Sequence, residues 1–110
     1  MSRLQGQQCQ RKTDVTAAAL AAVAEERDRQ FAKWGDQSGH PAGVWLAILT
    51  EEIGEAATEA IFMQIGDGRT DAERREALRS ELVQAAAVAV AWIEALDDAE
   101  ERETRYAGAA

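Results

Sequence analysis

The chain has 110 residues, enough for one domain with one modest core. Apolar residues make up 46% of it, which excludes a wholly disordered protein, but aromatic residues make up only 5%, so an Ala-rich core buries little area. The net charge of -8 argues against a nucleic-acid surface, which needs clustered Lys and Arg, and equally against binding to an anionic membrane. We therefore expect a homo-oligomer, because a second copy would complete the small core.

The N-terminal third predicts a tail followed by a helix. Residues 1–12 are polar and Gln-rich, and we expect them to form a flexible N-terminal tail. Thr13 or Asp14 offers an N-cap for a first helix that runs to about Lys33. Abundant Ala, Glu, Arg and Leu, a single Pro and no alternating strand pattern predict an all-α protein.

Two further helices are expected. Pro41 suits the first turn of a helix that should end near Ile65, before the stop signal at residues 66–68. Thr70 or Asp71 then caps a third helix that frays in the charged segment 97–105. The expected division is a single helical domain at residues 13–105 and a flexible C-terminus at residues 106–110. Long helices with short connections predict an antiparallel bundle.

The cellular location is predicted from cysteine content and hydropathy. Cys9 is the single cysteine, so the chain forms no internal disulfide, as is usual in a reducing compartment. Residues 1–12 lack the apolar stretch of a signal peptide. The longest apolar run, residues 85–93, is far shorter than the roughly 20 residues of a membrane span. We expect a cytoplasmic protein.

Paired carboxylates continue an apolar stripe on each of the last two helices. Glu52 and Glu55 share a helix face and are separated by a rise of about 4.5 Å, a spacing at which two carboxylates can share a cation. On the third helix, Glu81 and Gln84 show the same spacing at the start of an apolar run. Gathering these acids near a core is unfavourable unless a hard divalent cation such as Mg²⁺ binds them. The competing interpretation is a solvated acidic face, which is common on helices.

Two motifs carry a resemblance to a known family. The segment Glu51-Glu52-Ile53-Gly54-Glu55, followed by Glu81-Leu82-Val83-Gln84, resembles the EExxE…ExxD signature of the MazG-like all-alpha nucleoside triphosphate pyrophosphohydrolases. Residues 26–37, with His40-Pro41 after them, are similar to phage and actinobacterial members of that group. The resemblance covers roughly residues 25–96.

The resemblance implies a fold, a reaction and a ligand set. It implies a helical bundle that forms a homodimer or a dimer of dimers and cleaves nucleoside triphosphates into monophosphate and pyrophosphate. Motif position makes Glu52, Glu55 and Glu81 ligands of Mg²⁺, for which Mn²⁺ would substitute. Glu51 would hold a second ion or orient the attacking water, so Glu51 and Glu52 are the expected catalytic pair.

One position departs from the signature. Gln84 stands where the family has Asp, so the expected ligand set includes a neutral carbonyl oxygen and carries one negative charge fewer. Such a site would hold Mg²⁺ less tightly or hold fewer ions.

Substrate contacts are expected from the end of the first helix and the loop after it. Lys33 is the candidate for a phosphate contact, and Trp34 and Gln37 are placed to touch the base, while Gln30 shares a face with Lys33 and Trp34. Trp34 could equally be a packing anchor, and Lys33 could simply complement the end of the helix.

Three alternatives stay open at this point. A ferritin-like di-iron bundle is disfavoured because the chain has no Glu-x-x-His pair. A non-catalytic oligomeric module with a degenerate metal site is favoured by Gln84. An enzyme acting on an alarmone instead of a nucleoside triphosphate would have the same carboxylates.

Overall fold

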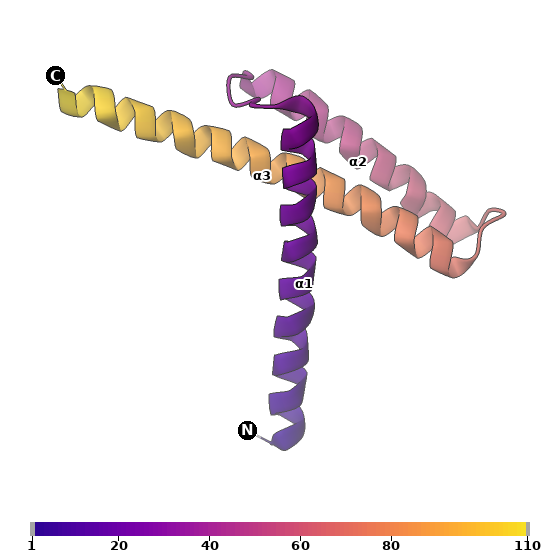
Figure 1. The fold of residues 1–110 in the computed structure, drawn as a ribbon. Coiled ribbons are helices and arrows are strands. Elements are labelled where there is room, and N and C mark those ends of the chain that lie inside the picture. The colour runs from indigo at the N-terminus through magenta and orange to yellow at the C-terminus, as the bar shows by residue number, and fades with distance from the viewer. Residues whose placement is uncertain (1, 110) are drawn as a thin grey trace.

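The computed structural model describes residues 2–109, which form three long α-helices and, within that range, no strand. Helix α1 spans Arg3–Trp34, α2 spans Ala42–Ile65 and α3 spans Asp71–Ala109. Helices α2 and α3 form an antiparallel hairpin (Figure 1). Helix α1 crosses α3, and its N-terminal half extends away from the hairpin (Figure 1). The all-helical class predicted from composition is confirmed.

Helix α1 begins well before the expected N-cap at Thr13 or Asp14. Its N-cap is Ser2, whose hydroxyl accepts a hydrogen bond from the backbone N–H of Gln5 (3.2 Å), while the Gln5 side chain accepts from the backbone N–H of Ser2 (3.0 Å). This reciprocal capping box satisfies two backbone donors at the helix start. The predicted start at Thr13 or Asp14 is therefore wrong, because Gln and Arg are good helix formers and residues 3–12 carry no Pro.

Helix α3 also continues beyond its expected end. The segment 97–105, predicted to fray, and residues 106–109 of the predicted C-terminal tail are helical, while Ala110 lies outside the described residues. Arg102 donates to the carbonyl oxygen of Asp98 one turn earlier (3.4 Å), a contact within this charged segment. A high content of Glu, Arg and Ala favours helix there, although most of its described side chains are exposed.

The turn between α2 and α3 is fixed at both ends. Helix α2 ends as predicted at Gly66, whose φ of 83° lies in the region that glycine adopts without strain. Thr70 caps α3: its hydroxyl accepts from the backbone N–H of Glu73 (3.1 Å), and the Glu73 carboxylate accepts from the backbone N–H of Thr70 (3.2 Å).

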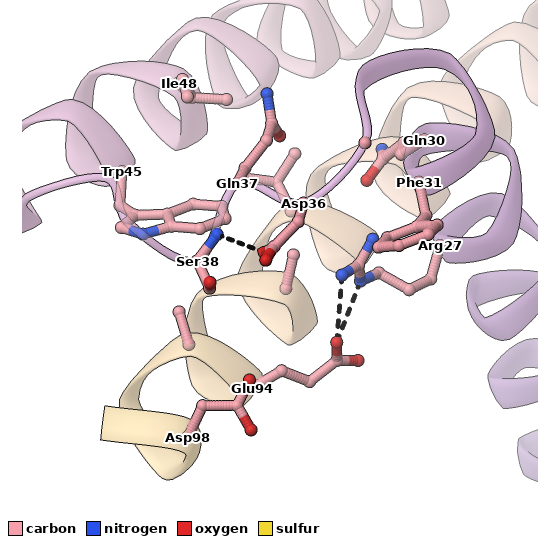
Figure 2. A pocket seen from close by; sticks show the side chains of 14 residues that line it. Arg27, Gln30, Phe31, Asp36, Gln37, Ser38, Trp45, Ile48, Glu94 and Asp98 are labelled. Atoms are coloured by element: carbon pink, nitrogen blue, oxygen red, sulfur yellow. Dashed lines mark hydrogen bonds and ion pairs between the residues drawn. The ribbon is translucent and has the colours of Figure 1, made fainter. Parts of the chain in front are cut away.

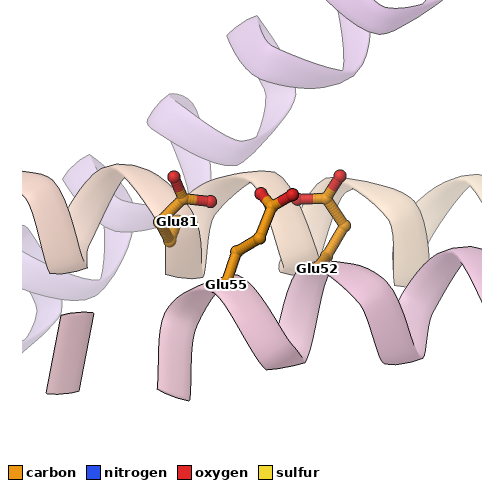
Figure 3. A group of neighbouring side chains, drawn as sticks. All are labelled: Glu52, Glu55 and Glu81. Carbon is orange, nitrogen blue, oxygen red and sulfur yellow. The ribbon is translucent and has the colours of Figure 1, made fainter. Parts of the chain in front are cut away.

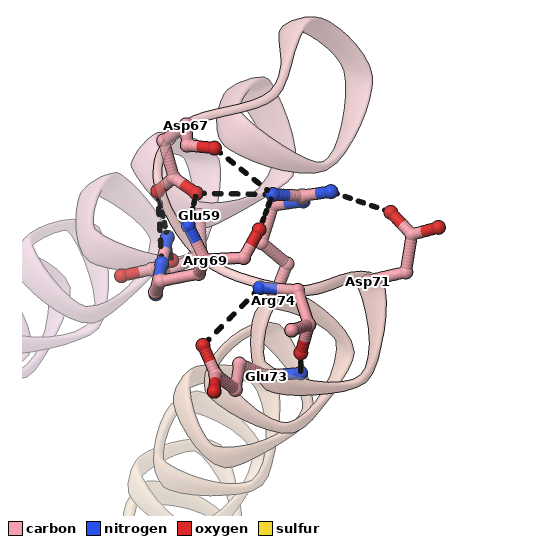
Figure 4. Close-up of polar contacts among 7 residues, drawn as sticks. Glu59, Asp67, Arg69, Asp71, Glu73 and Arg74 are labelled. Atoms are coloured by element: carbon pink, nitrogen blue, oxygen red, sulfur yellow. Dashed lines mark hydrogen bonds and ion pairs between the residues drawn. The ribbon is translucent and has the colours of Figure 1, made fainter.

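An ionic network spans the same turn. Asp67 binds the guanidinium groups of both Arg69 (2.7 Å) and Arg74 (3.1 Å), and Arg69 also binds Glu59 on α2 (2.7 Å; Figure 4). Arg69 has the larger effect on the acid: hydrogen bonds from it lower the pKa of Asp67 to about 2. The network thus ties the last turns of α2 to the first turn of α3.

The core is small and built largely from alanine. Trp45 of α2 is only 3% exposed and stacks on Trp92 of α3, with ring centroids 6.5 Å apart. The His40 ring packs edge-on against Trp45, with ring centroids 5.5 Å apart. Small side chains on α3 let the neighbouring helices approach closely; the buried ones are Ala85, Ala87, Ala91 and Ala95. Trp45 and Trp92 therefore hold the hairpin together.

Much apolar surface stays exposed in the single chain. Its accessible surface is 8240 Å², whereas a compact monomer of this mass exposes roughly 5,900 Å². Its radius of gyration is 18.5 Å, against about 13 Å for a compact domain of this length. None of the described helices is long and apolar enough to cross a membrane.

Candidate metal centre

Three glutamates from two helices converge on the hairpin. Glu52 and Glu55 project from adjacent turns of α2, and Glu81 projects from the facing turn of α3 (Figure 3). Each offers one carboxylate oxygen, and the three oxygens lie within 4.8 Å of one another. The i,i+3 spacing puts the α2 pair on one face, and the antiparallel packing of α3 brings Glu81 to it. The structure therefore joins the three residues predicted as metal ligands.

The environment of this Glu triad (Glu52, Glu55 and Glu81) disfavours negative charge. Burial raises the pKa of Glu52, and the charges of Glu55 and Glu51 raise it further. Burial also raises the pKa of Glu81, followed by a hydrogen bond shared with Glu55 and by the charges around it. Two like charges this close are stable only with a proton or a cation between them.

Two of the triad oxygens lack a donor. Oε2 of Glu52 and Oε2 of Glu81 are buried and, among the described residues, receive no hydrogen bond. An unsatisfied buried carboxylate oxygen is unfavourable, and it is the hard oxygen ligand that Mg²⁺ or Mn²⁺ accepts. The donor set thus fits a divalent cation, and the remaining ligands would be water or phosphate oxygens.

Glu59 is a fourth acid beside the triad, and the sequence analysis did not identify it. Its charge adds to the rise in the pKa of Glu81, while Arg69 holds its carboxylate at 2.7 Å. The spacing of Glu52, Glu55 and Glu59 along one face of α2 is the sequence signal that could have revealed it. Because Arg69 neutralises Glu59, this acid differs from the three that have no such partner.

A cavity of about 360 Å³ opens beside the triad. The Glu51 cavity, as we name it, is lined by residues of the α1 end and loop (Gln30, Trp34 and Gln37), by Ile48, Glu51 and Glu52 of α2, and by Val88 of α3. Three of the four predicted substrate contacts therefore share one space with the predicted catalytic acids. Their spacing in sequence gave no direct sign of this, because α1 reaches α2 only through its crossing of α3.

The predicted substrate contacts differ in how they are held. Trp34 is 61% exposed, which favours the substrate contact over the alternative of a packing anchor. The Lys33 ammonium lies 4.8 Å from the Trp34 ring centroid, a cation–π contact that places the cation next to the cavity residues without lining the cavity. Gln30 donates to the backbone carbonyl of Gln84 (3.3 Å), which links α1 to α3 at the level of the site.

Gln84 is engaged on its own helix. Its amide nitrogen donates to the hydroxyl of Ser80 one turn earlier (3.2 Å). The amide oxygen keeps its capacity to accept or to bind a cation. The ligand role of Gln84 stays a prediction.

Comparison with known proteins adds no relative. No protein-family model matches the chain, and neither a curated protein nor a solved structure is significantly similar to it.

Proposed function

We propose that the protein is a Mg²⁺-dependent nucleotide pyrophosphohydrolase that converts a nucleoside or deoxynucleoside triphosphate into monophosphate and pyrophosphate. The observation that carries this proposal is the convergence of Glu52, Glu55 and Glu81, with two buried oxygens that lack a donor. The resemblance of residues 25–96 to the MazG-like enzymes names the reaction. In a chain of net charge -8, triphosphate binding needs cations to bridge it to the carboxylates.

The three glutamates would hold the cation, and Gln84 would add a neutral oxygen. When bound, Mg²⁺ would neutralise the triphosphate and the charge that grows on the departing pyrophosphate. The loss of one negative charge at Gln84 predicts weaker cation binding than the full signature would give.

Glu51 and Glu52 face the cavity in which the reacting phosphates would lie. Glu51 would orient a water molecule and accept its proton as the water oxygen bonds to the α-phosphorus. The bond from that phosphorus to the oxygen bridging the α- and β-phosphates would break, and pyrophosphate would leave. Glu52 combines this role with cation binding.

The nucleoside would lie against the end of α1. Trp34 presents an exposed ring at the Glu51 cavity, and Gln30 and Gln37, which also line it, offer amides for hydrogen bonds to the nucleotide. Lys33 would meet the phosphates, because its ammonium lies at the Trp34 ring. We place this reaction in the cytoplasm, in keeping with the free and exposed Cys9.

We also propose that the functional form is a homo-oligomer. The excess surface of about 2,300 Å² over a compact monomer is in the range hidden by obligate homodimers. On α3, exposed Leu82, Ile93 and Leu96 form a stripe with Ala86 and Ala89 at alternating spacings of four and three, the repeat of a helix that packs along another helix. A second copy is the expected partner because on α2 the outward-facing Leu46 and Ile53, more than half exposed, supply a matching apolar surface.

A product assay tests the proposed reaction. The chain is incubated with Mg²⁺ and a panel of nucleoside and deoxynucleoside triphosphates plus one alarmone, and monophosphate, pyrophosphate and inorganic phosphate are quantified. We expect pyrophosphate, and Glu52→Gln should lower kcat by at least about 100-fold. Glu103→Gln, which removes the same charge from an exposed site on α3, should have no effect. Release of inorganic phosphate alone, or equal rates in both variants, would contradict the proposal.

A second candidate is a non-catalytic helical interaction module, which the Gln84 departure and the large exposed apolar surface favour. Such a module would bind partners through the same stripe and would show no change in melting temperature with Mg²⁺ and triphosphate. The enzyme should melt at a higher temperature when both are present.

A further inference from the structure

A second cavity lies on the other side of Gln30 and Gln37. We name it the Asp36 cavity; it has a volume of about 260 Å³ and lies between the end of α1, the following loop and α3 (Figure 2). It shares four lining residues with the Glu51 cavity, namely Gln30, Gln37, Ile48 and Val88. The two cavities are therefore neighbouring parts of one cleft, with the Glu triad beside only one of them.

The size and walls of the Asp36 cavity suit a flat ring. Sites for whole drug-sized ligands span about 300–1,000 Å³, so this space holds only part of a nucleotide. The indole of Trp45 and the ring of Phe31 line it, and both are surfaces on which a base can stack. Because Glu52 lines the Glu51 cavity and no member of the triad lines the Asp36 cavity, we place the phosphates in the former and the base in the latter.

The polar groups in this cavity include a hydrogen-bond acceptor, the Asp36 carboxylate, and a nearby guanidinium, that of Arg27. The carboxylate of Asp36 extends into the space between Trp45 and the Arg27–Glu94 ion pair (Figure 2). Its Oδ1 accepts the backbone N–H of Ser38 (2.9 Å), which fixes the side chain and leaves other acceptor sites on the carboxylate. The same backbone hydrogen bond is the main cause that lowers the pKa of Asp36, so the group is ionised and cannot donate at neutral pH.

Arg27 is held in place as well. Its Nε and Nη2 both donate to Oε2 of Glu94 (3.2 and 3.0 Å), and its guanidinium carbon lies 5.7 Å from the centroid of the Phe31 ring. This geometry leaves the Arg27 charge largely compensated by Glu94. Asp36 and Asp98 are then the lining carboxylates for which the described residues provide no ion pair, and Asp36 is the one that lies between Trp45 and the Arg27–Glu94 pair.

We propose that the Asp36 cavity binds the base of the substrate and selects bases that carry an exocyclic amino group over uracil and thymine. This inference rests on the proposed nucleotide pyrophosphohydrolase function. The amino groups of cytosine, adenine and guanine donate to a carboxylate, as they do in nucleic-acid recognition. The O4 carbonyl of uracil or thymine would instead face an acceptor, leaving two polar groups unpaired.

Asp36→Asn is the decisive variant. The asparagine oxygen can still accept the Ser38 N–H, so the loop keeps its hydrogen bond, while an NH₂ donor replaces the second carboxylate oxygen. The preference should therefore shift toward bases with a carbonyl at this position. Asp28→Asn, an equal charge change at an exposed position of α1 that does not line the cavity, is the matched control.

The experiment compares kcat/KM for dCTP, dATP, dGTP, dTTP and dUTP with Mg²⁺. The unmodified chain should favour an amino-bearing base over dTTP and dUTP by at least about tenfold, the size of one good base contact. In Asp36→Asn that ratio should fall to one or invert, and in Asp28→Asn it should stay. Equal kcat/KM for all five substrates, or an unchanged ratio in Asp36→Asn, overturns this inference while the hydrolase function stands.

Hydrolysis of none of the five triphosphates would contradict the proposed function, and a binding measurement then decides the inference. Saturation-transfer NMR with dCMP and dUMP reports direct contact with the chain. A signal for dCMP that exceeds that for dUMP and disappears in Asp36→Asn supports base selection in the cavity. Equal signals in both proteins overturn it.

Discussion

The carboxylate of Glu55 on α2 and that of Glu81 on α3 approach within 4.8 Å across the helical hairpin, beside Glu52. No lysine or arginine joins this group among the ion pairs of the described residues. The hairpin is thus built around a concentration of like charge that weakens it at neutral pH. A cation that removes this repulsion would stabilise the fold and prepare the site at once.

In the absence of divalent cations, Glu81→Gln should stabilise the protein at pH 7. The folded-state pKa of Glu81 is raised above its ordinary value of 4.5, first by burial, so this group's contribution to stability is present at low pH and is lost as the pH rises through the folded-state pKa. Removing one charge should raise the Tm at pH 7 by about 2–4 °C, for a like-charge repulsion of roughly 0.5 kcal/mol screened by solvent.

Thermal melts in EDTA at several pH values measure this effect. The advantage of Glu81→Gln should shrink as the pH falls to about 4, where the native glutamate is protonated in both states. Glu101→Gln, at an exposed position of the same helix, should change the Tm little at any pH. A Tm for Glu81→Gln below that of the unmodified chain at pH 7 in EDTA would show that like-charge repulsion in the Glu triad does not weaken the fold.

The two tryptophans Trp34 and Trp45 should respond differently to truncation. Trp34→Ala should raise the KM for the nucleotide by about threefold, because its ring holds the Lys33 ammonium that would meet the phosphates, and it should leave the Tm nearly unchanged. Trp45→Ala should destabilise the fold by about 3–5 kcal/mol, because this side chain is only 3% exposed. Steady-state kinetics and chemical denaturation of both variants measure the contrast, and a large stability loss in Trp34→Ala would show a packing role instead.

Ile93→Glu should separate the copies of the oligomer. The residue is 57% exposed at the middle of the α3 stripe, and a charge there would be buried against an apolar partner surface. We expect the apparent Kd of self-association to rise by at least about 100-fold, seen as a monomer mass by sedimentation or light scattering. Val15→Glu on α1, with 62% exposure outside the stripe, is the control. A monomer mass for the unmodified chain at micromolar concentration would rule out the oligomer.

Asp67→Asn should weaken the α2–α3 turn at neutral pH but not in strong acid. Hydrogen bonds from Arg69 lower the pKa of Asp67 to about 2, so the stabilising ion pairs are present above the ordinary value of 3.8 and are lost as the pH falls toward 2. The Tm difference between variant and unmodified chain should therefore be largest near pH 7, shrink as the pH falls below 3.8 and vanish only below about pH 2. Asp71→Asn, which removes only the exposed contact to Arg74, should have the smaller effect at pH 7. Equal Tm values at pH 7 would show that the network is dispensable.

The hairpin could be predicted from the sequence because its ends follow from local rules: glycine stops α2 at Gly66, and Thr70 caps α3. Helical spacing placed Glu52 on one face with Glu55 and put Glu81 at the edge of an apolar run. The resemblance to the MazG-like signature joined the three as one ligand set, because helical spacing does not say which turns of two helices face each other.

The remaining features depend on long-range packing or on signals that were overlooked. Ser2 and Gln5 have the spacing of a capping box, which indicates the early start of α1. The polar composition of residues 1–12 instead led to the prediction of a tail. The crossing of α1 over α3 could not be predicted, because the spacing of residues along one helix does not indicate which turn of α3 contacts Gln30. For the same reason the Asp36 cavity, formed by a loop residue opposite Glu94, appeared only in three dimensions.

Direct measurement of cation binding tests the central claim that acids from two helices bind one divalent ion together. Mn²⁺, the expected substitute for Mg²⁺, is titrated into the unmodified chain, Glu81→Gln and Glu101→Gln, and free ion is followed by electron paramagnetic resonance. We predict saturable binding to the unmodified chain and to Glu101→Gln, and an affinity at least about tenfold lower in Glu81→Gln because a ligand from the second helix is weakened. Equal affinity in all three proteins, or no saturable binding to the unmodified chain, would contradict the account.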